Sequence, residues 1–141
     1  MLCCEMTAWY KSQGMTLAQA MDALYSKHGF FRNDLASFTF EGADGMQKMS
    51  SIMQQLRSHA PTDLAGNAVT KVVDYQAGAN GLPKSNVLEF QTASSKVLVR
   101  PSGTEPKIKI YTMAQGKDEA EATAQTEKYK TDIMKVLGIG E

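Results

Sequence analysis

Long apolar runs, cysteines and an excess of either charge are missing or scarce in this chain of 141 residues. No run approaches the roughly 20 apolar residues that a helix needs to cross a bilayer, and no signal peptide is evident. Fifteen basic and fifteen acidic side chains cancel, so no overall field attracts nucleic acid or anionic lipid, and any anion site must be local. The sequence therefore indicates a cytoplasmic protein whose partners include neither a membrane nor a nucleic acid.

Cysteine occurs only as the adjacent pair Cys3 and Cys4. Neighbouring cysteines are poorly placed to bridge each other, which argues against a disulfide-stapled secreted domain and favours a reducing compartment. His28 and His59 show no metal-ligand spacing with the two thiols, so we expect no metal site. Both thiols are interpreted as buried or half-buried structural groups.

The composition that is present is that of an ordinary globular protein, with 43% apolar and 21% charged residues. Apolar residues recur with helical spacing in four segments. They predict helices over residues 1–13, from Thr16 to Gly29, after Asp44, and over residues 117–137. A chain of this length can bury a real hydrophobic core.

Two of these helices begin with a capping-box pattern, Thr16 with Gln19 and Asp44 with Gln47. The helix after Asp44 carries a methionine stripe, which predicts core packing rather than a ligand groove. Its expected buried face comprises Met46, Met49, Met53 and Leu56. The expected buried face of the last helix comprises Ala122, Tyr129, Ile133, Val136 and Leu137, before Gly138 ends it.

Alternating or apolar segments predict strands over residues 34–41, 69–75, 86–91, 96–100 and 107–112. Residues 61–66 and 78–83 are interpreted as loops. Short connections between the last strands favour antiparallel pairing. We therefore expect an α+β fold, a small, mainly antiparallel sheet of four to five strands with helices packed on one face. The first two helices stand apart from this pattern, which suggests that residues 1–30 end a preceding domain and residues 31–141 form another.

The chemistry of the sequence concentrates in Arg100–Pro106, which reads Arg-Pro-Ser-Gly-Thr-Glu-Pro between two predicted strands. Pro101 and Pro106 stiffen this loop, and a stiff loop loses less entropy when it orders around a ligand. Gly103 permits a positive φ and close backbone approach. The successive amides of residues 102–104 could therefore converge on an anion.

Polar side chains surround this glycine. Ser102 and Thr104 add hydroxyl donors, Arg100 supplies a planar fork that matches phosphate oxygens, and Lys109 adds diffuse positive charge if its face turns toward the loop. A rigid hairpin loop of turn formers explains Gly103 and the prolines equally well. That structural interpretation does not require the arginine and two hydroxyls, so the residues alone favour an anion site over it.

The segment Arg100–Tyr111 resembles the phosphate-binding loop in the C-terminal, fourth domain of the α-D-phosphohexomutases, which are the phosphoglucomutases and phosphomannomutases. Residues 86–91 and 95–99 resemble the strands that lead into that loop. Residues 10–17 and 41–49 are also similar to this family. The resemblance covers nearly the whole chain, and the heptad from Arg100 to Pro106 is its most specific part.

The resemblance implies the TBP-like α+β arrangement of that fourth domain. In the family, a phosphoserine in the first domain donates its phosphoryl group to a hexose phosphate, the bisphosphorylated sugar reorients, and Mg²⁺ assists. The fourth domain holds the phosphate that is not reacting. By resemblance, this phosphate of a glucose or mannose 1- or 6-phosphate is bound here by Arg100, Ser102, Gly103 and Thr104. Glu105 and Lys109 are secondary candidates.

The family's catalytic motifs are not found in this sequence: neither a phosphoserine loop, nor a metal loop, nor a sugar-binding loop. Asp44-Gly45 offers one carboxylate where the metal loop has three ligands, and it is interpreted as a helix cap. We therefore expect a fragment, the end of domain 3 plus domain 4, without a catalytic residue, metal or other cofactor of its own. Its partners would be the remaining domains of the same polypeptide, and alone it would be inactive. The alternative is a free-standing module that binds a phosphate ligand, nucleic acid or protein without catalysis.

Overall fold

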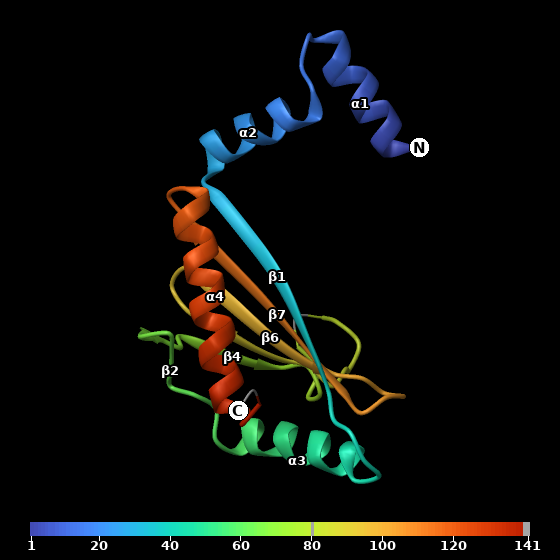
Figure 1. Ribbon diagram of the computed structural model, residues 1–141, viewed down its shortest axis with the longest axis vertical. Helices are drawn as coiled ribbons and strands as arrows, with labels where there is room; N and C mark the ends of the chain where they lie inside the picture. The colour runs from blue at the N-terminus through green and yellow to red at the C-terminus, as the bar shows by residue number, and fades with distance from the viewer. Residues whose placement is uncertain (80, 140–141) are drawn as a thin grey trace.

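A computed structural model describes residues 1–79 and 81–139, and Figure 1 shows a sheet covered by helices with a helical arm at one end. One residue of the predicted loop over residues 78–83, residue 80, lies outside the described residues. The elements in chain order are α1 (Leu2–Ser12), α2 (Leu17–His28), β1 (Phe30–Thr39), α3 (Gly45–Ser58), β2 (Asp63–Leu64), β3 (Asn67–Ala68), β4 (Lys71–Asp74), β5 (Leu88–Gln91), β6 (Ser95–Pro101), β7 (Lys107–Gly116) and α4 (Glu119–Val136).

The main sheet has five antiparallel strands in the order β1-β7-β6-β5-β4. This confirms the predicted α+β fold and the antiparallel pairing. β1 begins at Phe30, earlier than the predicted start at residue 34, because its first residues pair with the end of β7, where Phe30 lies opposite Gly116. Residues 30–33 show no strand alternation of their own, so only the partner strand explains why they are extended.

A small hairpin of β2 and β3 replaces the loop predicted over residues 61–66. Ala65 and Gly66 turn the chain with φ values of 55° and 78°, the positive values that a two-residue hairpin turn uses. Leu64 is buried in the core, and the Ala65 amide donates to Asp132 Oδ2 on α4 at 2.8 Å. Each strand contains only two residues, too few for an alternating pattern to reveal them.

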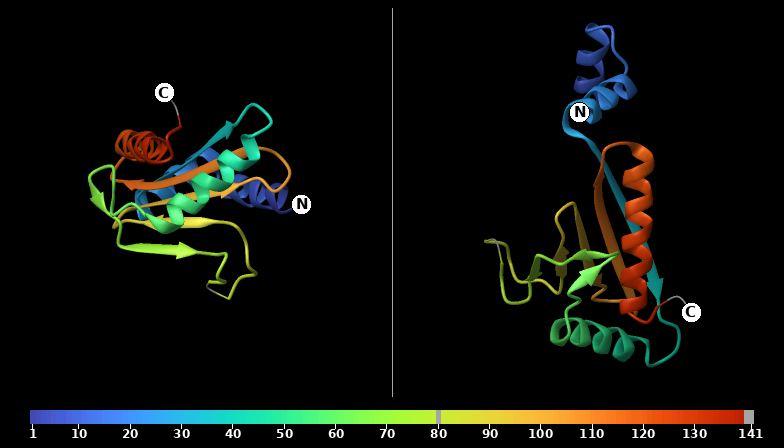
Figure 2. Two further views of the ribbon diagram at one scale, coloured as in Figure 1. Left: turned by 90° about the horizontal axis from the view of Figure 1, so that it is seen from below. Right: turned by 90° about the vertical axis from the view of Figure 1, so that its left-hand side faces the viewer.

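The hydrophobic core lies between the sheet and helices α3 and α4, and Figure 2 shows α4 running along β7 and β1. The sheet contributes Ala36, Leu88, Phe90, Val97, Val99, Ile108 and Ile110. The helices contribute Met49, Met53, Leu56, Tyr129, Ile133 and Leu137. Core packing is therefore confirmed for Met49 and Met53 of the methionine stripe, and burying each such side chain stabilises the fold by about 1.5–3 kcal/mol.

Three predicted details of these helices are wrong. Met46 and Val136, expected in the buried faces, are 45% and 44% exposed because each lies in a terminal turn of its helix. Asp44 precedes α3, but its side chain makes no cap hydrogen bond, since its backbone lacks the extended conformation of an N-cap. Asp44 instead pairs with Lys48 at 3.0 Å, and the hydrogen bond from Lys48 lowers the pKa of the Asp44 carboxyl.

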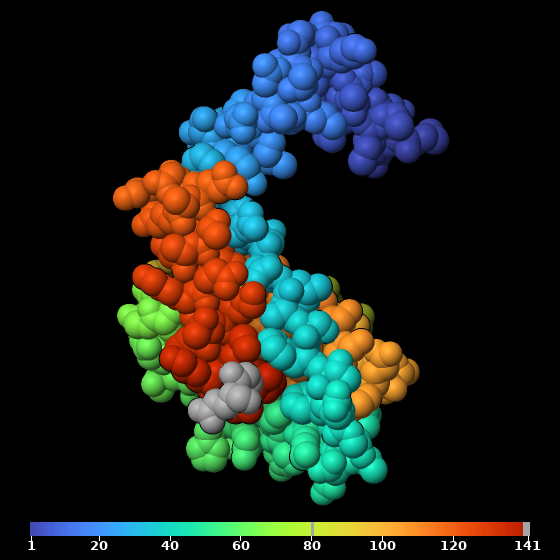
Figure 3. All heavy atoms as spheres, viewed as in Figure 1, coloured from blue at the N-terminus to red at the C-terminus, as the bar shows by residue number. Residues whose placement is uncertain are grey.

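Helices α1 and α2 form an arm that projects from the end of the sheet where β1 begins (Figures 1 and 3). The predicted capping box of α2 is confirmed: Thr16 Oγ1 accepts from the Gln19 amide at 3.2 Å, and Gln19 Oε1 accepts from the Thr16 amide at 2.9 Å. The arm buries Ala20 alone among its helical residues. The division into two domains at residue 30 stays a prediction.

The two cysteines lie on this arm, and both are exposed. The prediction of buried or half-buried thiols is therefore wrong, because α1 has no buried residue and nothing in the described part of the chain covers it. No helix within residues 1–79 and 81–139 combines the length and apolar character needed to span a membrane.

Candidate anion-binding site

The loop between β6 and β7 protrudes at the end of the sheet near the start of α3 (Figure 1). The Pro106 carbonyl anchors its far end by accepting a hydrogen bond from the Phe40 amide at 2.7 Å. Gly45, the first residue of α3, lies so close that a Cβ there would be 2.6 Å from the Phe40 carbonyl oxygen and 3.0 Å from Pro106 Cβ. Glycine at this position therefore lets α3 begin directly against the end of the loop.

Hydrogen bonds within the loop give it a defined shape. The Ser102 amide donates to the Lys107 carbonyl at 2.7 Å. The Ser102 hydroxyl oxygen in turn accepts from the amides of Thr104 at 3.4 Å and Glu105 at 3.3 Å. Of the three amides predicted to converge on an anion, those of Ser102 and Thr104 are thus occupied in this conformation. Among the described residues, only the Gly103 amide of these three has no acceptor.

Gly103 itself differs from its predicted role. Its φ is not positive, so the loop does not use the conformational freedom that glycine offers. A Cβ added at Gly103 would meet no atom of the described chain within 4 Å. Neither backbone conformation nor internal packing therefore explains a glycine at this position, and its backbone is open to close approach by a ligand.

Arg100 and Lys109 are directly opposite each other on β6 and β7. Both lie on the sheet face away from the helices, because their neighbours Val99 and Ile110 point into the core. Arg100 is exposed and Lys109 is half-buried. Within residues 1–79 and 81–139 neither forms an ion pair, so both positive charges are available to an anion.

Glu105 adds a negative charge to the loop, which would oppose anion binding if it stood alone. Its carboxylate pairs with Lys107 Nζ at 3.0 Å. The pair is exposed, so it contributes little to stability, roughly 0–1 kcal/mol. Its effect on the site is that the charge of Glu105 is balanced locally, leaving Arg100 and Lys109 as the net positive charge.

Two hollows flank the loop. The first is lined by residues 85–87 together with Arg100, Pro101, Ser102 and Gly103. The second lies between the loop and α3, and Ser102, Gly103 and Asn86 line it as well. The structure thus brings three of the predicted site residues, Arg100, Ser102 and Gly103, together in one hollow. The other candidates, Thr104, Glu105 and Lys109, line neither hollow.

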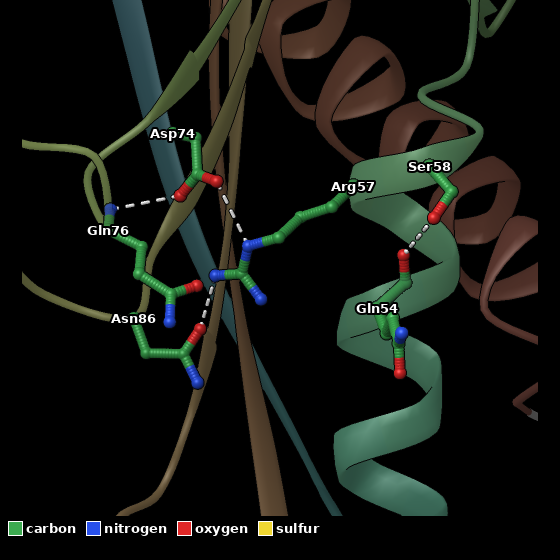
Figure 4. Close-up of polar contacts among 6 residues, drawn as sticks. All are labelled: Gln54, Arg57, Ser58, Asp74, Gln76 and Asn86. Atoms are coloured by element: carbon green, nitrogen blue, oxygen red, sulfur yellow. Dashed lines mark hydrogen bonds and ion pairs between the residues drawn. The ribbon is translucent and has the colours of Figure 1, made fainter.

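The sequence did not point to Asn86 or Arg57. Arg57, in the last turn of α3, donates from Nε to Asp74 Oδ2 at 3.0 Å and from Nη2 to Asn86 Oδ1 (Figure 4). Asn86 lies within the predicted strand over residues 86–91, but β5 begins only at Leu88. Asn86 lies near the loop because β5 pairs with β6. No local sequence motif predicts the register of that pairing.

The Mg²⁺ that the family resemblance implies finds no fitting ligands here. No group of three or more His, Cys, Asp or Glu side chains in the described part of the chain could hold a metal ion. Asp44, the carboxylate nearest in sequence pattern to the family's metal loop, is engaged with Lys48.

Comparison with known proteins places the chain in a family. Residues 18–130 match the family of the phosphoglucomutase/phosphomannomutase C-terminal domain. Phosphoglucomutase from Staphylococcus epidermidis is 36% identical over 112 residues, covering 72% of this chain and 20% of that protein. Phosphoglucomutase from Staphylococcus saprophyticus is 34% identical over 125 residues, covering 81% of this chain and 23% of that protein. The chain thus spans about a fifth to a quarter of these curated relatives.

The fold has a solved counterpart in the open form of the exocytosis-sensitive phosphoprotein pp63/parafusin, a phosphoglucomutase from Paramecium. The likeness has a TM-score of 0.57 at 17% identity and covers 94% of this chain and 26% of that one. At this identity the likeness concerns the fold alone. The family match, by contrast, runs from α2 through the sheet and the β6–β7 loop into α4, and it covers most of the residues. The chain therefore belongs to the phosphoglucomutase/phosphomannomutase C-terminal domain family.

Proposed function

We propose that this chain binds the phosphate of a hexose phosphate through the β6–β7 loop. The observation that carries the proposal is that Arg100, Ser102 and Gly103 line one hollow, where the guanidinium has no ion-pair partner among the described residues and the glycine backbone is open. A guanidinium donates two parallel hydrogen bonds to phosphate oxygens, a geometry that a lysine cannot reproduce. Membership of the family adds support, since relatives over this region are phosphoglucomutases.

Each residue of the loop has a part in this binding. Arg100 supplies the charge and the bidentate contact, and the Gly103 amide supplies a backbone donor. The Ser102 hydroxyl already accepts from two loop amides, so its own proton is directed away from them and is available to the anion. Thr104 contributes through its hydroxyl if the loop tightens around the ligand, and Lys109 adds longer-range positive charge.

Within a phosphoglucomutase- or phosphomannomutase-type enzyme, an intramolecular phosphotransferase of the isomerase class, this site would hold the phosphate that does not react. Binding energy gained at a remote phosphate orients the sugar so that its other end meets the phosphoryl donor. Glucose or mannose 1- or 6-phosphate is the proposed ligand. The donor and the Mg²⁺ would belong to other domains of a longer polypeptide, in the cytoplasm, and this chain alone would not interconvert the sugar phosphates.

Phosphorus NMR of glucose 1-phosphate tests the proposal. Adding the protein is expected to broaden and shift the phosphate resonance, with an affinity on the order of millimolar or weaker, because donors from other domains are absent. Arg100→Ala should remove this effect. Arg32→Ala is the matched control, since Arg32 is also exposed but lies at the far end of β1, opposite Ala114.

Equal loss of binding in both variants would show that only net charge matters, and it would contradict a site at the loop. A coupled assay with pure protein should detect no conversion of glucose 1-phosphate to glucose 6-phosphate. Measurable turnover would contradict the proposal that catalysis belongs to other domains.

A further inference from the structure

We propose that Asn86 is a further phosphate-binding residue, which donates its side-chain amide to the anion, and that Arg57 is a positioning residue that fixes the orientation of that amide. This inference rests on the proposed function of the β6–β7 loop. It extends the site across the hollow, from the loop to the segment that precedes β5.

Asn86 lies next to the β6–β7 loop. Asn86 lines the hollow that holds Arg100, Ser102 and Gly103, and it also lines the hollow between the loop and α3. It is the residue between Ser85 and Val87 in a segment that runs beside the end of β6, since Leu88 pairs with Val99. An anion in this hollow would therefore lie beside Asn86 as well as beside Arg100 and Gly103.

Two side chains hold Arg57 in a fixed position. Its guanidinium is half-buried and donates to Asp74 on β4 and to Asn86 (Figure 4). The second oxygen of Asp74, Oδ1, accepts from the Gln76 amide at 2.9 Å. Both carboxylate oxygens are therefore used, so Asp74 holds Arg57 in one place, and its negative charge is balanced by the guanidinium.

The chemistry of Arg57 and Asn86 determines how the side-chain amide of Asn86 is oriented. A guanidinium has donors only, so the atom of Asn86 that faces Arg57 must be the carbonyl oxygen. The amide nitrogen, which carries two donors, then occupies the other branch of the planar group, away from Arg57, as Figure 4 shows. Within the described residues this nitrogen has no acceptor. A donor turned away from a cation and left without a partner is suited to an anion.

The test uses inorganic phosphate and nitrogen–proton correlation spectra of the whole chain, with ionic strength held constant. In the wild-type protein, the paired side-chain amide signals of Asn86 should move together with the backbone amide signal of Gly103. Asn86→Asp should weaken phosphate binding by about tenfold or more, because a donor to a charged ligand is lost and a negative charge replaces it. Asn33→Asp, the same change at the far end of β1, should leave binding unchanged.

Asn86→Asp keeps an acceptor for Arg57, so the fold should stay intact. Its added negative charge also repels phosphate, so the donor role of Asn86 is tested by the movement of its side-chain amide signals in the wild-type protein, and the loss of binding in the variant supports it. Arg57→Lys keeps the positive charge but loses the planar guanidinium, which donates to Asp74 and Asn86 at the same time. It should displace the Asn86 side-chain amide signals even without phosphate and weaken phosphate binding by several fold, about the effect of one misdirected hydrogen bond.

The outcomes are distinguishable from failure of the proposed function. If the Gly103 signal moves but the Asn86 side-chain amide signals do not, the role of Asn86 is overturned while the loop site stands. If Gly103 does not move in the wild-type protein, the loop site fails and this inference fails with it.

Discussion

The β6–β7 loop at one end of the sheet and the α1–α2 arm at the other expose different kinds of group. The loop is tied by hydrogen bonds to Lys107 and Phe40, yet it leaves an arginine unpaired and a glycine amide free among the described residues. The arm is capped at Thr16 but leaves apolar side chains in the open. Its exposed large hydrophobics are Met1, Leu2, Met6, Trp9, Leu17, Met21 and Leu24.

The two ends of the sheet therefore differ in the chemistry that they expose, polar donors at the loop and apolar side chains on the arm. The loop is held in a defined shape by hydrogen bonds and exposes polar donors. The arm is complete as two helices, but its apolar surface is not covered by the described chain. Substitutions can therefore be chosen that change either phosphate binding at the loop or the free energy of unfolding, and leave the other quantity unchanged.

The largest contrast is in the cost of removing an apolar side chain. Ile110 in β7 is 0% exposed, whereas Leu2 in α1 is 81% exposed. Ile110→Ala is expected to lower the free energy of unfolding by about 2–5 kcal/mol, the usual range for a buried aliphatic truncation. Leu2→Ala should change it by less than about 0.5 kcal/mol. Urea unfolding followed by circular dichroism measures both, and similar costs would show that the arm packs on something.

The next contrast is between two glycines beside the loop. Gly45→Ala should destabilise the fold by about 1–3 kcal/mol, because the added methyl group clashes with the Phe40 carbonyl. Gly103→Ala should leave the unfolding free energy within about 0.5 kcal/mol. It should nevertheless weaken phosphate binding by about tenfold, or 1.4 kcal/mol, since the methyl group occupies the approach to the backbone. Unchanged binding in Gly103→Ala would argue that no ligand approaches there.

The smallest contrast concerns the ion pair that joins α4 to β1 below the arm. Lys130 Nζ lies 3.2 Å from Asp34 Oδ2, and the interaction with this carboxylate raises the pKa of Lys130 above its ordinary value of 10.5. A raised pKa means that the folded state holds this proton more tightly than the unfolded state. The pair therefore stabilises the fold below pH 10.5, and its contribution is lost as pH rises through the higher folded value.

Lys130→Met tests this sign. At pH 8 the variant should be less stable than the wild-type protein by about 0.2–1 kcal/mol, because the pair is partly exposed. The difference should shrink as the pH rises beyond 10.5 and through the raised pKa of Lys130. A difference that stays constant with pH would mean that the methylenes of Lys130, rather than its charge, stabilise the contact.

Much of the fold followed from local patterns. The alternation of Val97 with Val99 and of Ile108 with Ile110 gave the faces of two strands correctly. The capping box at Thr16 was visible because both partners are three residues apart. The start of β1 was missed because its partner, the end of β7, is distant in the chain. The β2–β3 hairpin was missed because each of its strands has only two residues, too few to show an alternating pattern.

The residues of the candidate site also fall into those that the sequence predicts and those that only the structure reveals. Arg100, Ser102 and Gly103 are neighbours in sequence, so their motif could be recognised directly. Asn86 and Arg57 reach the same place from other elements, through strand register and a side chain from α3. The exposure of Cys3 and Cys4 was mispredicted for the reverse reason, since apolar neighbours in sequence do not ensure that anything packs over them.

The central claim is that the β6–β7 loop is an anion site, and the backbone amide of Gly103 reports on it most directly. Titration with phosphate, followed by nitrogen–proton correlation spectra, should move the Gly103 signal in the wild-type protein and not in Arg100→Ala, while the signals of α1 and α2 stay in place. A Gly103 signal that remains still in the wild-type protein, or that moves equally in Arg100→Ala, would contradict the account.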